Sequence, residues 1–445
     1  MSAIPTLNPD DDRPVTRSAL IERFHGYGAP KDRWLVGGEF ERILLWGDGR
    51  ALAYDEPNGV RWVLSELVRR HGWEPREEDG HLIELRRNGA STTLEPGGQI
   101  ELSGAPHKRL LDLQQETQTS FDEIQGIIAG LDLHMIALGL TPTAKIRDIP
   151  WVPKGRYRVM RDYLGETGDL AHAMMKGTSS FQANFDFADE ADCAKKVSAL
   201  SRLGPLTTAM FANSPFYEGS LSDYTSFRGH IWTRTDPART GFPEALREDY
   251  THERWVDNLL DVPMMFYLKE GRWAEAKGRT FREYMEKGLD GHFPRTMDWE
   301  LHLTSVFPEV RVKRTIEVRG ADACPLPIAI GGIALWTGLI YDDVALDEAN
   351  ALAAELSRSG TLQSRFETAC RQGLSGEVGG RTFAAWARDL TEIGARGLGR
   401  ARPEERHLLS PVEALVAGGE SLGQRLRRAA EGGLSGRDLL LSARY

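Results

Sequence analysis

Apolar runs broken by turn residues predict strands in the first hundred residues of the chain. Residues 34–46 form one such run, and residues 81–87 and 91–102 form two more, separated by Asn88-Gly89. An Asn-Gly pair favours the tight turn of a β-hairpin, because both central residues of that turn adopt positive φ. Pro96-Gly97-Gly98 interrupts the third run, so a break or bulge is expected there. The pattern therefore predicts an antiparallel sheet in this part of the chain.

Apolar residues at helical spacing alternate with further strand patterns. An amphipathic helix is predicted over 59–71, and a longer one from Pro106 to about Leu131, since proline suits the first helical turn. Residues 147–163 begin as a loop because of two prolines, and residues 212–241 lack a regular pattern. Other helices are predicted at 17–25, 190–203, 205–212 and 255–263, and other strands at 135–140, 179–187 and 312–320.

The composition of the chain changes near residue 347. Beyond it the sequence is rich in Ala, Leu and Arg at helical spacing, which predicts four or five helices. The first fifteen residues are polar and are expected to be disordered. We therefore expect a disordered N-terminus (1–15), an α+β core (16–345) and a helical region (346–445) packed on that core in one compact unit.

Glutamates recur on three predicted strands, several of them at the two-residue spacing that directs side chains to one face. Buried carboxylates that converge are unstable alone, because desolvation and mutual repulsion favour the protonated form. Several that stay ionised imply a cluster of hard cations, for which oxygen ligands suit Mg²⁺ or Mn²⁺. The glutamates are Glu39, Glu41, Glu95, Glu101 and Glu317.

A simpler interpretation applies to each of these glutamates taken singly. A carboxylate on a solvated strand face with a cross-strand Lys or Arg partner needs no metal, because glutamate is mostly exposed in proteins. Only the set of five, on strands flanked by glycine, favours a functional cluster.

Two further stretches carry polar groups that could bind a substrate. Lys154, Arg156, Arg158 and Arg161 lie close together, which is typical of an anion site or of a solvated basic loop. In the strand predicted over 179–187, polar residues alternate with aromatic and small ones, and the polar face either lines a site or meets water.

The composition of the chain and the absence of several motifs argue against some classes of function. The chain has 445 residues with a formal net charge of −10, and no basic cluster interleaved with aromatics dominates, so nucleic-acid binding is not indicated. Residues 325–340 are apolar but interrupted by Pro327, Gly331 and Gly332, which favours a core segment over a membrane span. No phosphate-binding glycine loop of the Walker type and no dinucleotide motif occur. Nucleotide chemistry would therefore depend on metals and arginines.

Eight blocks of the sequence carry a family resemblance: 94–106, 148–157, 211–216, 230–233, 261–264, 307–311, 317–322 and 339–342. In this order they resemble the plant-type glutamate–cysteine ligases, which are also common in proteobacteria. The resemblance runs from about Trp34 to Asp343 and continues more weakly to the C-terminus. It implies an α+β fold whose mostly antiparallel catalytic sheet is related to that of glutamine synthetase and is surrounded by helices.

The resemblance implies ATP-dependent joining of the γ-carboxylate of L-glutamate to the amine of L-cysteine. The reaction would pass through a γ-glutamyl phosphate and give γ-glutamylcysteine, in the first step of glutathione synthesis. Phosphoryl transfer between anions needs charge neutralisation, here by two or three Mg²⁺ ions, or Mn²⁺, together with arginines. A γ-glutamyl ligase with another amine acceptor and a metal-dependent hydrolase are the alternatives.

The same resemblance assigns roles to individual residues. The five glutamates match metal-binding positions, and Glu317 and Arg319 match catalytic ones. The substrate-binding positions are Arg156, Arg228, Gln182 and Asn184, and the ATP-binding positions are Arg319 and Lys154. We expect a cytoplasmic protein, because residues 1–17 have neither a secretory nor a transit-peptide pattern. We also expect a monomer or homodimer without membrane or nucleic-acid partners.

Overall fold

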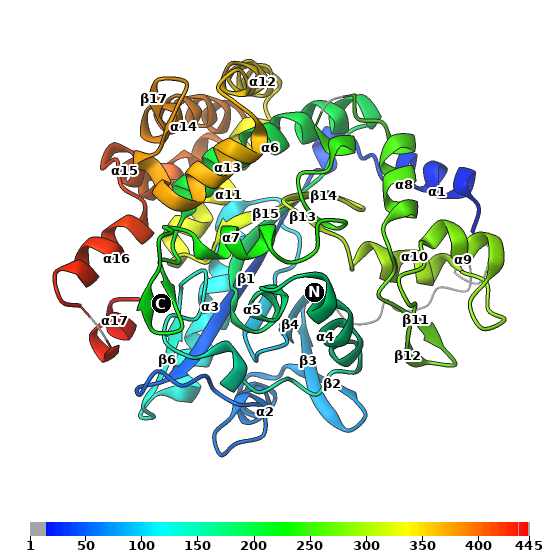
Figure 1. Ribbon diagram of the computed structural model, residues 1–445. Coiled ribbons are helices and arrows are strands. Elements are labelled where there is room, and N and C mark those ends of the chain that lie inside the picture. The colour runs from blue at the N-terminus through cyan, green and yellow to red at the C-terminus, as the bar shows by residue number, and fades with distance from the viewer. Residues whose placement is uncertain (1–14, 248, 435, 444–445) are drawn as a thin grey trace.

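The computed structural model describes residues 15–247, 249–434 and 436–443 (Figure 1). Its main sheet contains nine strands among these residues, and every adjacent pair is antiparallel. The strands are β1 (Val36–Trp46), β2 (Glu74–Glu78), β3 (His81–Arg87), β4 (Ala90–Leu94), β5 (Ile100–Ser103), β6 (Leu133–Ile136), β7 (Ser180–Phe185), β14 (Val310–Val312) and β15 (Ile316–Asp322). Their order is β14-β15-β7-β1-β5-β4-β3-β2, with β6 paired to the end of β1.

Four small two-stranded sheets lie outside this main sheet in the described part of the chain. They are formed by β8 (Phe216–Tyr217) with β9 (Ser220–Leu221), β10 (Thr240–Gly241) with β13 (Phe307–Pro308), β11 (Phe266–Lys269) with β12 (Arg272–Glu275), and β16 (Glu377–Val378) with β17 (Arg381–Thr382).

Helices surround the sheet. Those in the first two thirds of the chain are α1 (Arg17–His25), α2 (Val60–His71), α3 (Leu110–Ile128), α4 (Gly155–Thr167), α5 (Ala171–Gly177), α6 (Glu190–Phe211), α7 (Phe227–Thr233), α8 (His252–Asp261), α9 (Phe281–Lys287) and α10 (Thr296–Leu303). The later ones are α11 (Leu326–Ile340), α12 (Asp343–Ser357), α13 (Leu362–Gln372), α14 (Phe383–Ala401), α15 (Ser410–Ala417), α16 (Leu422–Glu431) and α17 (Gly436–Ser442). Short 3-10 helices cover 31–33, 146–148, 244–246, 373–375 and 403–409.

The two faces of the sheet differ in chemistry. On one face, Phe40 of β1 contacts Phe121 of α3, and Phe181 of β7 contacts Phe211 of α6 and Trp336 of α11. All five rings are buried, so α3, α6 and α11 form the core on this side. Because side chains alternate along a strand, the residues between these aromatics point to the opposite face. Figure 1 shows α4, α5 and α7 on that side of the sheet.

The predicted hairpin is confirmed, and the break in its second run creates another. Asn88 and Gly89 have φ of 51° and 89°, as the tight turn between β3 and β4 requires. Residues 95–99 then form a turn between β4 and β5, in which the Glu95 amide donates to the Gln99 carbonyl at 2.9 Å. The Val152 amide donates to the Pro96 carbonyl at 2.9 Å. The turn is therefore held on both sides.

We predict that Gly97→Ala destabilises the protein by about 1–3 kcal/mol, because this turn has no room for a side chain. A Cβ at Gly97 would collide with the Lys176 carbonyl oxygen and lie 2.7 Å from the Lys176 Cα. Both are backbone atoms and cannot rotate away. Denaturant unfolding measures the effect. Gly126→Ala in α3, where nothing lies within 4 Å, is the matched control and should be neutral or stabilising. Equal stability of both variants would contradict the prediction.

Three helical elements depart from the sequence expectation. The helices predicted over 190–203 and 205–212 are one helix, α6, which continues through Pro205. Its second half is buried almost throughout, so packing offsets the hydrogen bond that proline removes. Helix α3 begins at Leu110 instead of Pro106. Residues 212–241, expected to be irregular, contain α7, whose first turn is capped by the Ser226 hydroxyl accepting from the Gly229 amide.

The C-terminal region is helical, as predicted. In the described residues it contains α12 to α17, one helix more than the upper expectation. Helix α14 packs on α11, which joins this region to the core. A boundary near residue 345 stays a prediction. The disorder expected for residues 1–15 falls, except for Val15, outside the described residues. No single helix of the described chain is long and apolar enough to cross a membrane; α11 and α12 reach that length only as a pair bent by 98°.

Candidate active site

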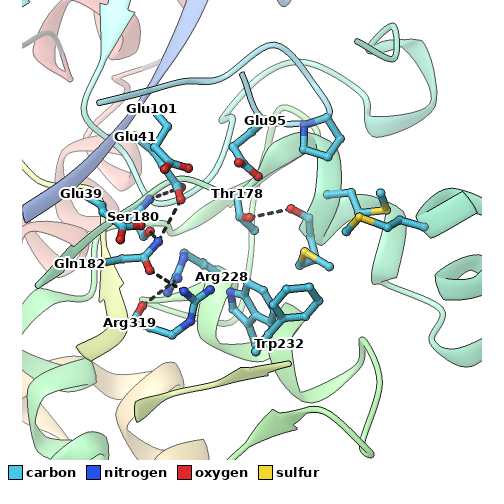
Figure 2. Close-up of a pocket in the computed structure, with 15 residues that line it drawn as sticks. Glu39, Glu41, Glu95, Glu101, Thr178, Ser180, Gln182, Arg228, Trp232 and Arg319 are labelled. Carbon is cyan, nitrogen blue, oxygen red and sulfur yellow. Dashed lines mark hydrogen bonds between the residues drawn. The ribbon is translucent and has the colours of Figure 1, made fainter. Parts of the chain in front are cut away.

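Four glutamates gather on the polar face of the sheet (Figure 2). Glu41 of β1 lies directly opposite Glu101 of β5, and Glu39 lies opposite Gln182 of β7. Glu95, in the turn after β4, reaches the same cavity. Like charges directly opposite one another destabilise a strand pair. The sheet therefore tolerates a repulsion at its centre that a structural role does not explain.

These glutamates line one cavity. The opposite side of the cavity is largely apolar and includes Met160, Met174, Met175, Trp232 and Phe307. Arg228 and Arg319 supply positive charge to the wall. The remaining lining residues are Pro96, Thr178, Ser180 and Gln182. The cavity thus joins an acidic wall, two guanidinium groups and an apolar wall in one small space.

Burial and mutual repulsion act on the acid cluster. Glu41 and Glu101 are only 9% and 1% exposed. Burial raises the pKa of Glu41 to about 8, and the nearby carboxylates of Glu95 and Glu101 add to the rise. Burial also raises the pKa of Glu39 and of Glu95. Glu101 is the exception: although burial opposes this, hydrogen bonds from the Ser103 hydroxyl and from Glu95 lower its pKa to about 2. Glu39, Glu41 and Glu95 therefore favour bound protons, or bound cations, over a set of free anions.

The donor set fits hard divalent cations. Glu39, Glu41, Glu95 and Glu101 offer only carboxylate oxygens, and these side chains converge on one cavity (Figure 2). Mg²⁺ and Mn²⁺ prefer such oxygens, whereas zinc sites usually include nitrogen or sulfur. A cation would also remove the repulsion between Glu41 and Glu101.

We predict that the metal-free protein loses stability as pH rises from about 5 to 8. The pKa of Glu41 lies above its unfolded value, so the folded state binds more protons than the unfolded state in this window. The free energy of unfolding therefore decreases as pH rises. Excess Mg²⁺ should reverse the loss by replacing protons. Thermal unfolding with a chelator or with Mg²⁺, at both ends of the window, measures this. A chelated protein whose stability rises toward pH 8 would contradict it.

Gln182 connects the acid cluster to Arg319. Its amide Nε2 donates to Glu41 Oε1 at 3.2 Å, and its Oε1 accepts from Arg319 Nη1 at 2.7 Å. The Ser180 backbone amide donates to Glu41 Oε2 at 2.7 Å. The strand alternation that pointed to a polar face on residues 179–187 is confirmed, and it places Gln182 in the cavity.

Glu317 is beside the cluster but does not line the cavity. It is fully buried, and both of its oxygens accept from Arg311, at 2.5 and 3.0 Å. Arg319 Nη1 lies 3.2 Å from Oε1, and Lys313 Nζ lies 3.7 Å from Oε2. Although burial opposes this, the three cations hold the pKa of Glu317 well below its usual range. Its assignment as a metal ligand stays a prediction; in the structure it anchors Arg319.

Arg311 is a residue that the sequence analysis missed as a partner of Glu317. It lies directly opposite Glu317 in the pairing of β14 with β15 and is 1% exposed. The signal was present in the sequence, since two strands joined by a three-residue turn at 313–315 bring residues 311 and 317 into register.

Arg228 reaches the cavity from α7. Its Nη2 donates to the Arg319 carbonyl at 3.1 Å, and its Nη1 lies 3.8 Å from Asp322 Oδ1. Asp322 in turn accepts from the Asn213 backbone amide at 2.7 Å and from the Ser214 hydroxyl at 2.6 Å. The Arg228 Nε is buried and has no hydrogen-bond partner among the described residues. Asp322, which the sequence analysis gave no role, therefore fixes an arginine with spare donor capacity.

Three other predicted site residues lie next to the cavity but not on its wall. Asn184 donates to Glu39 Oε1 at 3.0 Å. Lys154 and Arg156 begin α4, are 5% and 3% exposed, and feel the charge of Glu95. Burial, and then the charge of Arg156, lowers the pKa of Lys154 to about 8. The substrate and ATP roles assigned to these three residues stay predictions.

Comparison with known proteins places the chain in a family. The model of the glutamate–cysteine ligase family 2 matches residues 35–439. The chain belongs to this family. It is therefore a ligase, and the resemblance read from the sequence blocks is confirmed.

Two plant relatives illustrate the extent of the match. The chloroplastic glutamate–cysteine ligase of Nicotiana tabacum is 34% identical over 425 residues, which cover 93% of this chain and 79% of the relative. The chloroplastic enzyme of Arabidopsis thaliana is 35% identical over the same length and the same shares. Family similarity thus extends through the core and most of the helical C-terminal region.

A solved structure supports the fold. The glutamate–cysteine ligase of Francisella tularensis, solved in complex with AMP, superposes with a TM-score of 0.58 over 92% of this chain and 87% of that one. Its sequence identity is 14%. The predicted fold class, a mostly antiparallel sheet surrounded by helices, is confirmed.

The expected cytoplasmic location is wrong. The plant relatives from tobacco, Medicago truncatula and Arabidopsis are named as chloroplastic enzymes. The prediction failed because it rested on the missing transit-peptide pattern in residues 1–17, which does not determine the compartment.

Proposed function

We propose that the protein joins the γ-carboxylate of L-glutamate to the amine of L-cysteine at the expense of ATP, giving γ-glutamylcysteine for glutathione synthesis. The observation that carries this proposal is the convergence of four buried carboxylates with Arg228 and Arg319 on one cavity, in a chain of the glutamate–cysteine ligase family. A carboxylate and an amine do not condense in water, so the acid must be activated. A charge-rich cavity suits activation by phosphoryl transfer.

Cations belong to this proposal because the acid cluster fits them. Glu39, Glu41, Glu95 and Glu101 would hold Mg²⁺, or Mn²⁺, in two or three sites, as the resemblance implies. Bound there, Mg²⁺ would supply positive charge against the phosphate oxygens of ATP. The acid wall alone would repel ATP, so it serves the reaction only when it is neutralised in this way.

The first step transfers the γ-phosphoryl group of ATP. An oxygen of the glutamate γ-carboxylate attacks the γ-phosphorus, the bond to the bridging oxygen breaks, and ADP leaves. Negative charge spreads over the transferring group. Arg319 would stabilise that charge, and its hydrogen bonds to Glu317 and Gln182 support this role because they fix the direction of its guanidinium.

The second step forms the amide. The amine nitrogen of cysteine attacks the γ-carbonyl carbon of glutamyl phosphate, phosphate leaves with the bonding pair, and the amine loses a proton. Arg228 would hold a substrate carboxylate with its spare donor capacity, since Asp322 and the Arg319 carbonyl keep it in place. The apolar wall with Met160, Met174 and Met175 would limit water, which otherwise hydrolyses the acyl phosphate.

The test is a product assay with ATP, Mg²⁺ and L-glutamate, to which L-cysteine or other amines are added one at a time. The proposal expects ADP release that requires both amino acids, and γ-glutamylcysteine by mass. Glutamate labelled with heavy oxygen in its γ-carboxylate should pass one label to phosphate. ADP release with another amine but not with cysteine would indicate a γ-glutamyl ligase with that other acceptor. ADP release that needs no amine and gives no labelled amide product would indicate a hydrolase.

A further inference from the structure

A second group of metal-ligating side chains lies outside the cavity. It consists of His25 at the end of α1, Glu190 at the start of α6 and His252 at the start of α8. One ligand atom from each lies within 4.8 Å of the others. Figure 1 shows α1 and α8 side by side at one edge of the molecule, and none of the three residues lines the cavity. Three distant parts of the chain thus meet here.

The central member of this group is a buried imidazole. His252 is fully buried, and its Nδ1 lies 2.9 Å from the Tyr250 hydroxyl. Its Nε2 is buried without a hydrogen-bond partner in the described part of the chain. The ring lies 4.9 Å from the His25 ring, centroid to centroid. A buried polar atom without a partner is costly, so it marks a place where a ligand would complete the structure.

The Tyr250 hydroxyl can set the tautomer that a metal requires. It lies between His252 Nδ1 and the buried Cys193 thiol. If Nδ1–H donates to the Tyr250 oxygen, the hydroxyl hydrogen is available to the Cys193 sulfur, and Nε2 carries a lone pair. A ligating histidine almost always donates its other ring N–H in this way, which fixes the ring and raises its basicity.

Glu190 is oriented by a separate contact. One carboxylate oxygen, Oε1, accepts from the His252 backbone amide at 2.5 Å. This bond ties the start of α6 to the start of α8 and holds the carboxylate beside the imidazole. A carboxylate has two oxygens, so one can keep this bond while the other takes part in binding a cation.

We propose that His25, Glu190 and His252 form a site for a divalent transition-metal ion of the zinc class. Two imidazoles and one carboxylate are a donor set typical of zinc, with water in the fourth position, whereas the oxygen-only cluster in the cavity suits Mg²⁺. Ligand atoms around one zinc ion are about 3–3.5 Å apart, given bonds of about 2 Å. His25 is exposed, so rotation of its side chain can close the remaining distance.

A metal at this site would fasten α1 to the body of the protein. Helix α1 has nine residues, of which Leu20 and Phe24 are buried, and its other ties include Arg17 to Asp257 and Arg23 to Glu300. An isolated helix of this length is marginal. Coordination of His25 would therefore stabilise the position of α1 against α6 and α8.

The test is a Co²⁺ titration of the full chain in excess Mg²⁺, which keeps the oxygen cluster occupied. We expect one strongly bound equivalent with the intense visible absorption of four-coordinate Co²⁺ bound to nitrogen, and its displacement by Zn²⁺. His25→Ala should weaken binding by at least about 10-fold. His407→Ala, which changes another exposed histidine, is the matched control and should bind as the unchanged protein does.

A second variant separates coordination from folding. Glu190→Gln keeps an oxygen acceptor for the His252 amide but removes the charge, so it should fold and bind Co²⁺ more weakly. Zn²⁺ should raise the unfolding temperature of the unchanged protein and not that of His25→Ala. The proposal would be overturned if bound Co²⁺ showed only the absorption typical of six-coordinate oxygen ligation. Equal Co²⁺ affinity in His25→Ala and in the unchanged protein would also overturn it. Ligase activity plays no part in this readout.

Discussion

Glu101→Gln is expected to leave the fold intact and to reduce ligase turnover by at least about 100-fold. Glu101 lies directly opposite Glu41, lines the cavity and is 1% exposed. Glutamine has the same shape and still accepts a hydrogen bond from the Ser103 hydroxyl, which contacts Oε1 at 2.7 Å. The substitution removes one negative charge from the cluster that we propose to hold Mg²⁺, so phosphoryl transfer loses its charge neutralisation.

A stability measurement separates this effect from misfolding. Without metal, the variant should still unfold in one cooperative transition, because glutamine keeps the hydrogen bond from Ser103 and removes the repulsion with Glu41. Mg²⁺ should raise its unfolding temperature less, since stabilisation by a ligand follows its affinity. Glu77→Gln on the exposed strand β2 is the matched control and should change neither property. Near-normal turnover in folded Glu101→Gln would refute the metal-ligand assignment.

Arg319→Lys is expected to lower kcat by about 10²–10³-fold, or about 3–4 kcal/mol, with a smaller effect on the KM for glutamate. The Arg319 guanidinium donates through Nη1 to both Gln182 and Glu317. Lysine keeps the positive charge but cannot present the same planar fork. A loss confined to kcat would indicate stabilisation of charge in the transition state.

The fold should survive this change, because Glu317 keeps its pairing with Arg311 and Lys313. Circular dichroism and thermal unfolding check this. Arg158→Lys in α4, an exposed arginine outside the cavity, is the matched control and should retain full turnover. Unchanged kcat in Arg319→Lys would show that positive charge alone suffices at this position and would contradict a directional role.

The local sequence pattern was sufficient to predict much of the sheet. The Asn88-Gly89 turn and the break at Pro96-Gly97-Gly98 were predicted because both depend on backbone conformations that few residues adopt. The shared face of Glu39 and Glu41 followed from the two-residue period of a strand. The sequence blocks carried the family, which the family model confirmed.

Packing decided what local pattern could not. Proline at 205 predicts a helix end, but the buried surroundings of α6 stabilise a continuous helix. Helix α7 was missed because it has only seven residues and an internal glycine, although it carries Arg228 into the cavity. The compartment was also predicted wrongly, since it is not encoded in the folded core.

The sequence by itself determined which residues could do chemistry: the glutamates, the arginines and the strands that carry them. Only the tertiary structure decided which of them meet. It paired Glu317 with Arg311, placed Gln182 between Glu41 and Arg319, and brought His25 to His252 across more than half the chain. Such contacts depend on strand register and helix packing between distant segments, and these are set by the whole core rather than by local residue pattern.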